Sequence, residues 1–216
     1  MTKEQDTPAS LTEETLARGL SLLAAADADL ARVLERCGAP PLWKREAGFE
    51  TLVYIMLEQQ VSLASAKAVY DRLLALASPL TPERLLALDD AKLKSIGFSR
   101  QKIAYTKGLA RAMVAGELDL HALELMDDEA ARGELIKLKG IGAWTADIYL
   151  LRALLRADVW PAGDLALAVA AQEIKNLPAR PTPEELNNLS EAWRPWRAVA
   201  ARVLWQYYLC ESRFQV

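Results

Sequence analysis

Apolar residues recur every three or four positions along almost the whole chain, which is the spacing that gives a helix one buried face. Leu16, Leu20 and Leu23 share such a face behind residues 10–13, whose Ser-Leu-Thr-Glu sequence has the spacing of a capping box. No segment alternates convincingly between apolar and polar residues, and β-branched residues are few. The pattern therefore predicts an all-α fold.

Residues that favour helix ends and turns divide this pattern into separate helices. Asp27 is expected to cap a helix that Gly38 stops, and Ser62 is expected to cap another. The stretch 49–58 is apolar on nearly all sides, so it is expected to be central in the fold. The other long helices are expected near residues 63–76, 99–115, 128–137, 143–155, 164–175, 183–193 and 196–211.

The composition is that of an ordinary globular protein, with 52% apolar and 25% charged residues among 216. No apolar run approaches the roughly 20 residues of a membrane span, and the polar N-terminus lacks the apolar core of a secretory signal. The cysteines are Cys37 and Cys210 and the one histidine is His121, which excludes most zinc sites. Two isolated cysteines favour reduced thiols in a cytoplasmic protein over a disulfide.

The net charge of −3 argues at first against a nucleic-acid partner, but the charges are unevenly distributed along the chain. Between positions 92 and 111 there is no acidic residue and there are six basic ones: Lys92, Lys94, Arg100, Lys102, Lys107 and Arg111. Such a run is often only a solvated helix face. Because it lies beside glycine turns, we favour a local basic stripe on an acidic protein.

The most informative segment is residues 138–147 (LKGIGAWTAD), where two glycines separate two expected helices. Gly140 and Gly142 allow a tight turn whose bare N–H groups, at a helix N-terminus, can hold a phosphate. Lys137 and Lys139 add positive charge beside that site. The turn could also serve only to join two helices, but its charge favours contact with a nucleic-acid backbone.

Thr145 follows the turn closely, at the start of the second expected helix. It could donate its hydroxyl to the same phosphate, or it could merely cap that helix.

The sequence around the turn has a partial repeat earlier in the chain. Residues 93–99 (LKSIGFS) repeat the Leu-Lys-x-Ile-Gly frame of residues 138–144, and each stretch stands between a short helix and a long one. The repetition suggests two similar helix–turn–helix units lying against one duplex, although seven positions could agree by chance.

Three blocks in this order resemble the helix–hairpin–helix (HhH-GPD) DNA glycosylase superfamily, and within it the 3-methyladenine DNA glycosylase II (AlkA) type. They are residues 57–62 (LEQQVS), 138–146 (LKGIGAWTA) and 193–197 (WRPWR), and the similarity runs from about residue 49 to residue 208. The resemblance implies two helical subdomains with an active-site cleft between them. It also implies hydrolysis of the N-glycosidic bond of alkylated purines, such as 3-methyladenine and 7-methylguanine, in base excision repair.

The resemblance assigns the chemistry to Asp164, which follows a loop containing Pro161 and Gly163. An ionised carboxylate there would stabilise the positive charge that develops on the deoxyribose as the base departs. Asp164 is also a typical helix N-cap, and the two roles can coexist because amides at a helix start favour a charged carboxylate. The loop of residues 156–163 is long enough to return Asp164 to the hairpin end of the preceding helix.

Electron-rich rings attract a cationic purine, so Trp144 is expected to line the base pocket. The resemblance implies Trp205 as a second pocket residue, and Tyr54 is a weaker third candidate. Each ring could equally be a core residue. Gln59 and Gln60 stand where the family carries the wedge that fills the gap left by a flipped base. Their alternative role is simply to end a helix.

Some family features are absent from this sequence. Trp144 occupies the position at which lyase members carry a lysine, so no Schiff base can form there and we expect a monofunctional enzyme. Too few residues precede the helical core for an N-terminal β domain, and Cys210 alone cannot hold an iron–sulfur cluster. No metal or cofactor is expected, apart from a monovalent cation that the hairpin backbone could hold.

For the whole chain we expect N-terminal helices in residues 1–48 that pack on a single catalytic unit of residues 49–216, with the hairpin at about 137–143. The expected partner is double-stranded DNA containing alkylated bases, with no membrane contact and with the protein as a monomer. Three other functions stay open: a glycosylase for deaminated or mismatched bases, a non-catalytic DNA-binding module, and a helical scaffold for protein interactions.

Overall fold

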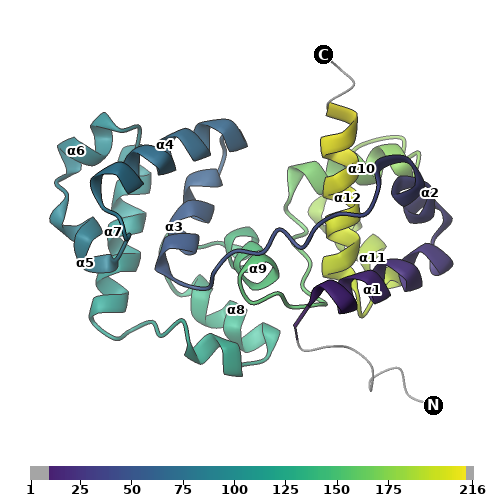
Figure 1. Cartoon of the computed structure of the whole chain (residues 1–216), viewed down its shortest axis with the longest axis horizontal. Helices are drawn as coiled ribbons and strands as arrows, with labels where there is room; N and C mark the ends of the chain where they lie inside the picture. The colour runs from purple at the N-terminus through teal and green to yellow at the C-terminus, as the bar shows by residue number, and fades with distance from the viewer. Residues whose placement is uncertain (1–9, 213–216) are drawn as a thin grey trace. The chain divides into compact units, whose positions relative to one another are not determined.

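The computed structural model describes residues 10–212, which contain twelve α-helices and no strand (Figure 1). The all-α prediction is confirmed. The α-helices are α1 (Glu13–Ala26), α2 (Ala28–Cys37), α3 (Phe49–Glu58), α4 (Leu63–Leu76), α5 (Pro82–Ala87), α6 (Asp90–Ser95), α7 (Arg100–Val114), α8 (Asp128–Ile136), α9 (Ala143–Arg152), α10 (Leu165–Ile174), α11 (Pro183–Ser190) and α12 (Arg197–Ser212). Within this part of the chain, none of the helices has the length and apolarity needed to cross a membrane.

The described chain divides into two compact units. One, here called the terminal unit, combines residues 10–44 with residues 154–212, and the other, the central unit, is the continuous stretch 45–153. The structure thus groups the N-terminal helices with the C-terminal ones, whereas the sequence suggested a division after residue 48. That residues 49–216 act as a single catalytic unit stays a prediction.

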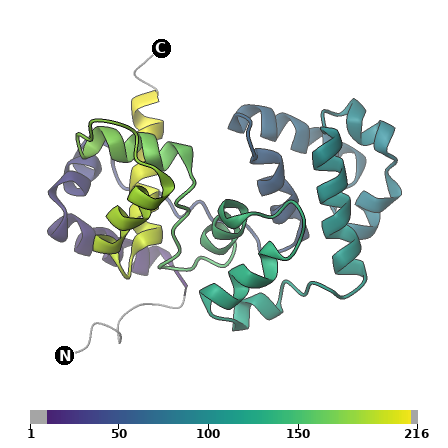
Figure 2. The ribbon, with the colours of Figure 1, turned by 180° about the vertical axis from the view of Figure 1, so that it is seen from behind.

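In the terminal unit, α1 and α2 pack against α12, and α10 packs against both α2 and α12. Figure 2 shows the purple helices of the N-terminus beside the green and yellow helices of the C-terminus. Asp27 caps α2 by accepting hydrogen bonds from the backbone of Asp29 and Leu30, as its place in the sequence suggested. The fully buried Arg202 side chain donates to the carbonyl of Leu42 at 3.0 Å, which fixes the chain that leaves α2 against α12.

An ionic cluster joins α2 to the end of α10. Lys175 Nζ lies 2.7 Å from both carboxylate oxygens of Asp27 and 2.8 Å from Asp29 Oδ2. Trp193 Nε1 also donates to Asp27, at 2.8 Å. Burial raises the pKa of Asp27, but the hydrogen bonds from Lys175 and Trp193 outweigh it, and the net result is a pKa below the usual range.

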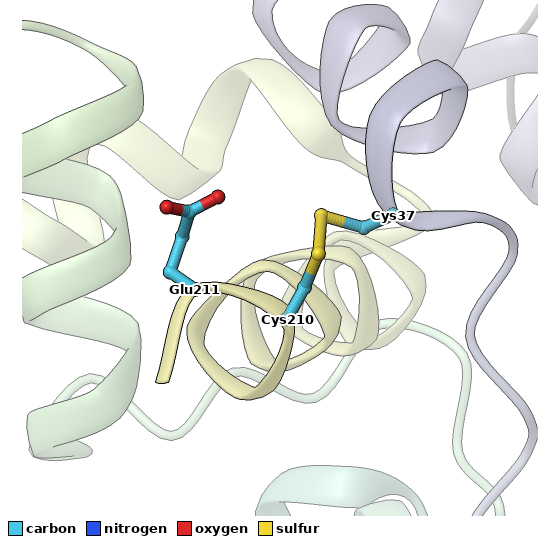
Figure 3. Close-up of side chains that lie close together, drawn as sticks. All are labelled: Cys37, Cys210 and Glu211. Carbon is cyan, nitrogen blue, oxygen red and sulfur yellow. A yellow bond between two sulfur atoms is a disulfide. The ribbon is translucent and has the colours of Figure 1, made fainter. Parts of the chain in front are cut away.

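The structure corrects the prediction of reduced thiols, because Cys37 and Cys210 form a disulfide (Figure 3). The two cysteines are 173 residues apart in sequence, yet their Cα atoms are 5.9 Å apart, since the last residues of α2 and of α12 lie side by side. Spacing along the chain could not reveal this proximity. Glu211 lies nearby, but it pairs with Arg36 at 2.7 Å, and disulfide sulfurs are not thiolate ligands.

In the central unit α3 forms the middle, as its apolar sequence predicted. Nine of its ten residues are buried, and it packs against α4, α7 and α9. Its last residue, Glu58, is 8% exposed and pairs with Arg152 of α9 at 3.0 Å. At the other end, the N–H of Gly48 donates to the hydroxyl of Tyr149, 3.0 Å away. Burial raises the pKa of this tyrosine to about 12, despite the opposing bond from Gly48.

Most helix boundaries agree with the sequence pattern to within a few residues, and two differences have physical causes. The first helix is capped by Thr12, whose hydroxyl accepts from Thr15 in a capping box, rather than by a box that begins at Ser10. α9 ends at Arg152 and not at Leu155. Leu155 takes a left-handed φ of 55° and its carbonyl accepts from the N–H of Leu11, 2.7 Å away, so a long-range bond ends the helical path.

Candidate functional site

The turn between α8 and α9 requires its first glycine for two reasons. Gly140 has a φ of +98°, in the region that side chains disfavour, and a Cβ added to it would lie 2.3 Å from Cγ of Tyr105 on α7. Gly142 is the N-cap of α9 and offers no side chain to the first amides of that helix. No side chain of the N-cap residue therefore occupies the first backbone N–H groups of α9, which is the arrangement expected of an anion-binding turn.

A partly buried ion pair fixes the two helices of this hairpin against each other. Arg132 on α8 donates through Nε to Oδ1 of Asp147 on α9 at 2.6 Å, and the Asp147 residue is 5% exposed. Ile141, between the two glycines, is 3% exposed and is thus part of the core. The hairpin is therefore held in shape by contacts between its own two helices.

The candidate DNA-binding side chains of the hairpin differ in exposure. Lys137 and Lys139 are exposed, and the first pairs with Glu134 at 2.6 Å in an exposed pair that can exchange partners at little cost. Thr145 is only 2% exposed, and its hydroxyl accepts a hydrogen bond from Nε2 of Gln59 at 2.8 Å. The helix cap is Gly142 instead, so the cap role for Thr145 is wrong, while its phosphate role stays a prediction that its burial does not favour.

The two candidate wedge residues follow α3 and lie in different surroundings. Gln59 is half-buried, and its Nε2 also donates to the carbonyl of Gly140 at 3.0 Å. Gln60 is exposed and has a left-handed φ of 58°. Its neighbour Val61 is 45% exposed, so the chain presents a short, partly apolar loop before α4 begins at Leu63.

Asp164 is the N-cap of α10, in the terminal unit. Its Oδ1 accepts the backbone N–H of Leu167 at 3.0 Å and the indole N–H of Trp205 at 3.1 Å, and the residue is 8% exposed. The capping role considered from the sequence is therefore confirmed. Because the carboxylate is held from two directions, its orientation is fixed by the fold, as a catalytic carboxylate requires.

A second aromatic residue, Trp43, packs against Trp205 and was missed from the sequence. Trp43 meets Trp205 edge to face, with ring centroids 6.3 Å apart and an interplanar angle of 74°. Trp43 is half-buried and has a φ of 49°, a backbone conformation that is costly for a bulky residue and often marks a functional position. The Pro-Pro-Leu-Trp sequence of residues 40–43 was the only local signal, and it is typical of any loop.

The other two pocket candidates, Tyr54 and Trp144, belong to the central unit. Tyr54 is 7% exposed, meets Tyr70 edge to face at 4.7 Å, and has the guanidinium of Arg45 3.6 Å from its ring centre. The protein's own cation therefore takes one face of this ring, which fits its alternative role in packing. Trp144 is half-buried in the first turn of α9. The pocket role of both residues stays a prediction.

The basic run of residues 92–111 is not a uniform stripe. Lys102 donates to the carbonyl of Leu57 at 2.5 Å, and burial lowers its pKa. Lys107 pairs with Asp90 at 2.5 Å, while Lys92, Lys94 and Arg100 are exposed around the turn between α6 and α7. A patch of three cations therefore remains at that turn.

The sequence echo between residues 93–99 and 138–144 does not extend to the backbone. Gly97 has a φ of +109°. Gly142, which holds the same position in the repeated Leu-Lys-x-Ile-Gly frame, has a φ of −93°. The positive φ of the hairpin falls instead at Gly140, two residues earlier. The two turns join their helices in different ways, so the turn at Gly97 is not a copy of the hairpin turn.

Comparison with known proteins identifies the class to which this fold and these residues belong. Residues 53–195 match the family described as HhH-GPD superfamily base excision DNA repair protein. The match spans the hairpin, Gln59, Gln60 and Asp164. The chain therefore belongs to the HhH-GPD superfamily of base excision DNA repair proteins.

The relatives in this family share a specific name. The chain is 30% identical over 167 residues to DNA-3-methyladenine glycosylase 1 of Schizosaccharomyces pombe, covering 76% of this chain and 73% of the relative. It is 29% identical over 205 residues to the DNA-3-methyladenine glycosylase of Bacillus subtilis, covering 83% and 68% of the two chains.

Solved structures show the same likeness in three dimensions. The S. pombe 3-methyladenine DNA glycosylase (Mag1), solved in complex with abasic DNA, superposes with a TM-score of 0.82 at 29% identity over 87% of this chain and 95% of that one. The DNA-3-methyladenine glycosidase of Bacillus halodurans gives a TM-score of 0.74 at 28% identity, over 94% and 93% of the two chains.

Proposed function

We propose that this protein is a monofunctional DNA glycosylase of base excision repair that hydrolyses the N-glycosidic bond of alkylated purines in duplex DNA. The observation that carries the proposal is the carboxylate of Asp164, held by the N–H groups of Leu167 and Trp205, where the Trp205 ring in turn packs against Trp43. The relatives named above are 3-methyladenine glycosylases, which supports the same reaction and the same class of base.

The proposed chemistry places the negative charge of Asp164 next to the reacting sugar. As the glycosidic bond breaks, positive charge develops on the deoxyribose, and a fixed carboxylate stabilises it without having to reorganise. The same oxygen atoms can orient or deprotonate the attacking water. Because the Trp205 indole and the α10 backbone already fix this carboxylate, little ordering is left for the moment of reaction.

The aromatic residues suit a positively charged base. An alkylated purine such as 3-methyladenine or 7-methylguanine carries a positive charge and leaves without being protonated first, so this reaction needs no separate general acid. Indole faces attract such a cation, and Trp205, which donates to Asp164, packs edge to face with the half-buried Trp43. We therefore add Trp43 to the proposed base pocket.

The central unit is proposed to hold the DNA. The amides at Gly140 and Gly142 and the exposed side chain of Lys139 would bind a phosphate without regard to sequence. The target base must leave the stack to be cleaved, at a cost of a few kcal/mol. Gln60, exposed on its loop, is proposed to occupy the vacated space, where its amide could bond to the orphaned partner base.

Hydrolysis without strand cleavage follows from the identity of residue 144. A lyase reaction needs an amine that forms a Schiff base with the sugar, and Trp144 supplies none at the position that carries the lysine in lyase relatives. The proposed product is therefore free base plus an intact strand with an abasic site.

Release of free base from methylated duplex DNA tests this function directly. The wild type should release 3-methyladenine and 7-methylguanine, while Asp164→Asn, which keeps the helix cap, should lose at least about 10²-fold in rate. A matched panel carrying uracil, hypoxanthine or mismatched bases tests the second candidate, a glycosylase for neutral bases. If the wild type releases neither class, or if Asp164→Asn releases base at the wild-type rate, the proposal is wrong.

A cytoplasmic location and a monomeric state, both expected from the sequence, are part of the same proposal. Light scattering of the purified protein with and without a short duplex tests the monomer, and cell fractionation tests the location.

A further inference from the structure

The loop that carries Gln60 is tied to the phosphate-binding hairpin by a single side chain. Nε2 of Gln59 donates to the carbonyl of Gly140 at 3.0 Å and to the hydroxyl of Thr145 at 2.8 Å. These contacts span 81 and 86 residues of sequence and all lie within the central unit. The amide reaches both sides of the turn, because Gly140 precedes Gly142 and Thr145 lies in the first turn of α9.

Two residues of α7 support the same two segments. Lys102 donates to the carbonyl of Leu57, in the last turn of α3. Its positive charge there also interacts favourably with the negative end of the helix dipole. One turn further along, Tyr105 fills the space that a side chain at position 140 would need. The helix end from which the loop leaves and the turn that binds phosphate are thus fixed against one helix as well as against each other.

The neighbouring residue shows what this support provides. Gln60 has a φ of 58°, a left-handed conformation that costs a residue with a side chain on the order of 1 kcal/mol, and its side chain is exposed. Such a conformation persists only where the surroundings hold it. The bonds of Gln59 to the hairpin, one residue away, provide that restraint.

We propose that Gln59 is not part of the wedge but a positioning residue that couples the hairpin to the wedge loop, so that binding of a phosphate at the hairpin fixes where Gln60 enters the duplex. This inference rests on the proposed function, since it assumes a duplex with a displaced base. It divides the two adjacent glutamines by role: Gln60 contacts DNA, and Gln59 contacts only the protein.

The buried hydroxyl of Thr145 acquires a role through the same bond. Because it is 2% exposed and accepts from Gln59, it serves as the fixed point to which the loop is attached. Thr145→Val keeps the shape and removes the acceptor, whereas Thr145→Ser keeps the acceptor. This pair of substitutions separates the hydrogen bond from simple packing.

The test measures DNA binding without any chemistry. Fluorescence anisotropy gives the affinity for an undamaged duplex and for a duplex with a tetrahydrofuran abasic analogue, and 2-aminopurine opposite the analogue reports unstacking. The variants are Gln59→Ala, Gln60→Ala, the double variant, Thr145→Val and Thr145→Ser. Gln206→Ala is the control, because it removes a comparable side-chain bond, to the carbonyl of Cys37 in the terminal unit.

If Gln59 positions the wedge, Gln59→Ala lowers the preference for the abasic duplex about tenfold and the 2-aminopurine signal with it, while affinity for the undamaged duplex stays within about twofold. Thr145→Val should lower the preference about threefold. Thr145→Ser and Gln206→Ala should stay within twofold of the wild type. The double variant should show the same preference for the abasic duplex as Gln60→Ala alone, because Gln59 has nothing to position once the Gln60 side chain is removed.

Two results would overturn the inference. Multiplying effects in the double variant would show that Gln59 and Gln60 act independently, and equal losses on both duplexes would show that Gln59 only supports the hairpin or touches DNA itself. Failure of the proposed function is distinguishable, because it appears as absent base release by the wild type, whereas these binding ratios do not depend on excision.

Discussion

The indole N–H of Trp205 donates to Oδ1 of Asp164 across 3.1 Å, and the same oxygen accepts the amide of Leu167. α12 and the first turn of α10 therefore fix one carboxylate together. Trp205 does two things at once, since its ring also meets Trp43. The polar and the aromatic contributions can be separated by substitution.

Trp205→Phe keeps an aromatic face and removes the N–H donor. We expect kcat for release of 7-methylguanine to fall about tenfold with little change in KM, because a lost hydrogen bond loosens the carboxylate. Trp43→Phe is the matched control, since it leaves the bond to Asp164 intact, and its effect should fall mainly on KM. Equal losses of kcat in both variants would contradict this division of roles.

Gly140→Ala should destabilise the central unit by at least about 2 kcal/mol, because the new methyl group meets Tyr105 and the φ of +98° is unfavourable. Gly133→Ala, in the middle of α8 with open space around it, should instead raise stability by up to about 1 kcal/mol. Urea unfolding monitored by circular dichroism compares the two. A Gly140→Ala protein as stable as the wild type would show that this turn can relax.

Lys139, beside the hairpin turn, should contribute to the salt dependence of DNA binding. Lys139→Ala is expected to reduce the slope of log affinity against log salt by about 0.9, the value for one phosphate contact, on undamaged and damaged duplexes alike. Arg180→Ala, an exposed cation of the terminal unit, should leave the slope unchanged. Titrations at four salt concentrations decide the matter, and an unchanged slope for Lys139→Ala would remove this residue from the phosphate site.

The ionic cluster at Asp27 predicts a pH-dependent stability. The pKa of Asp27 is lowered in the folded protein from its ordinary value of 3.8, so its stabilisation is fully present above that value and is lost as the pH falls through the folded pKa. Asp27→Asn, which can still cap α2, should cost about 2 kcal/mol at pH 7 and much less once the pH falls below the folded pKa of Asp27. A difference from the wild type that does not change with pH would refute the ion pair as its source.

The disulfide predicts a dependence of stability on reductant. Because it closes a loop of 173 residues, its reduction should lower the free energy of unfolding by up to about 5 kcal/mol. Thermal unfolding with and without dithiothreitol measures the effect. The Cys37→Ser, Cys210→Ser double variant should unfold at the same temperature in both conditions, and a wild type that is equally insensitive would exclude the bond.

Local patterns were sufficient to predict most of the fold. The extent of α3 follows from its apolar stretch and the start of α4 follows from Ser62, since apolar spacing and capping act over a few residues. Asp27 and Asp164 were likewise predictable as caps. The sequence motif also located the hairpin, because its two glycines serve a backbone geometry that few other residues allow.

What the sequence could not supply were contacts between distant residues. The disulfide, the edge-to-face pair of Trp43 and Trp205, and the bonds from Gln59 to Gly140 join positions between 81 and 173 residues apart. Each depends on how helices pack, and not on the spacing of neighbours. The lysines show the same limit, since burial of Lys102 against Leu57 could not be read from a run of positive charges.

The terminal unit is interrupted: the chain leaves it after Lys44 and returns at Leu154. A ribosome therefore completes the whole central unit before it makes α12, the helix against which α1 and α2 are packed. Until then α1 and α2, which bury Leu16, Leu20 and Val33 in the finished protein, lack one of the helices that they pack against. During synthesis the apolar faces of α1 and α2 are therefore exposed to aggregation until α12 has been made.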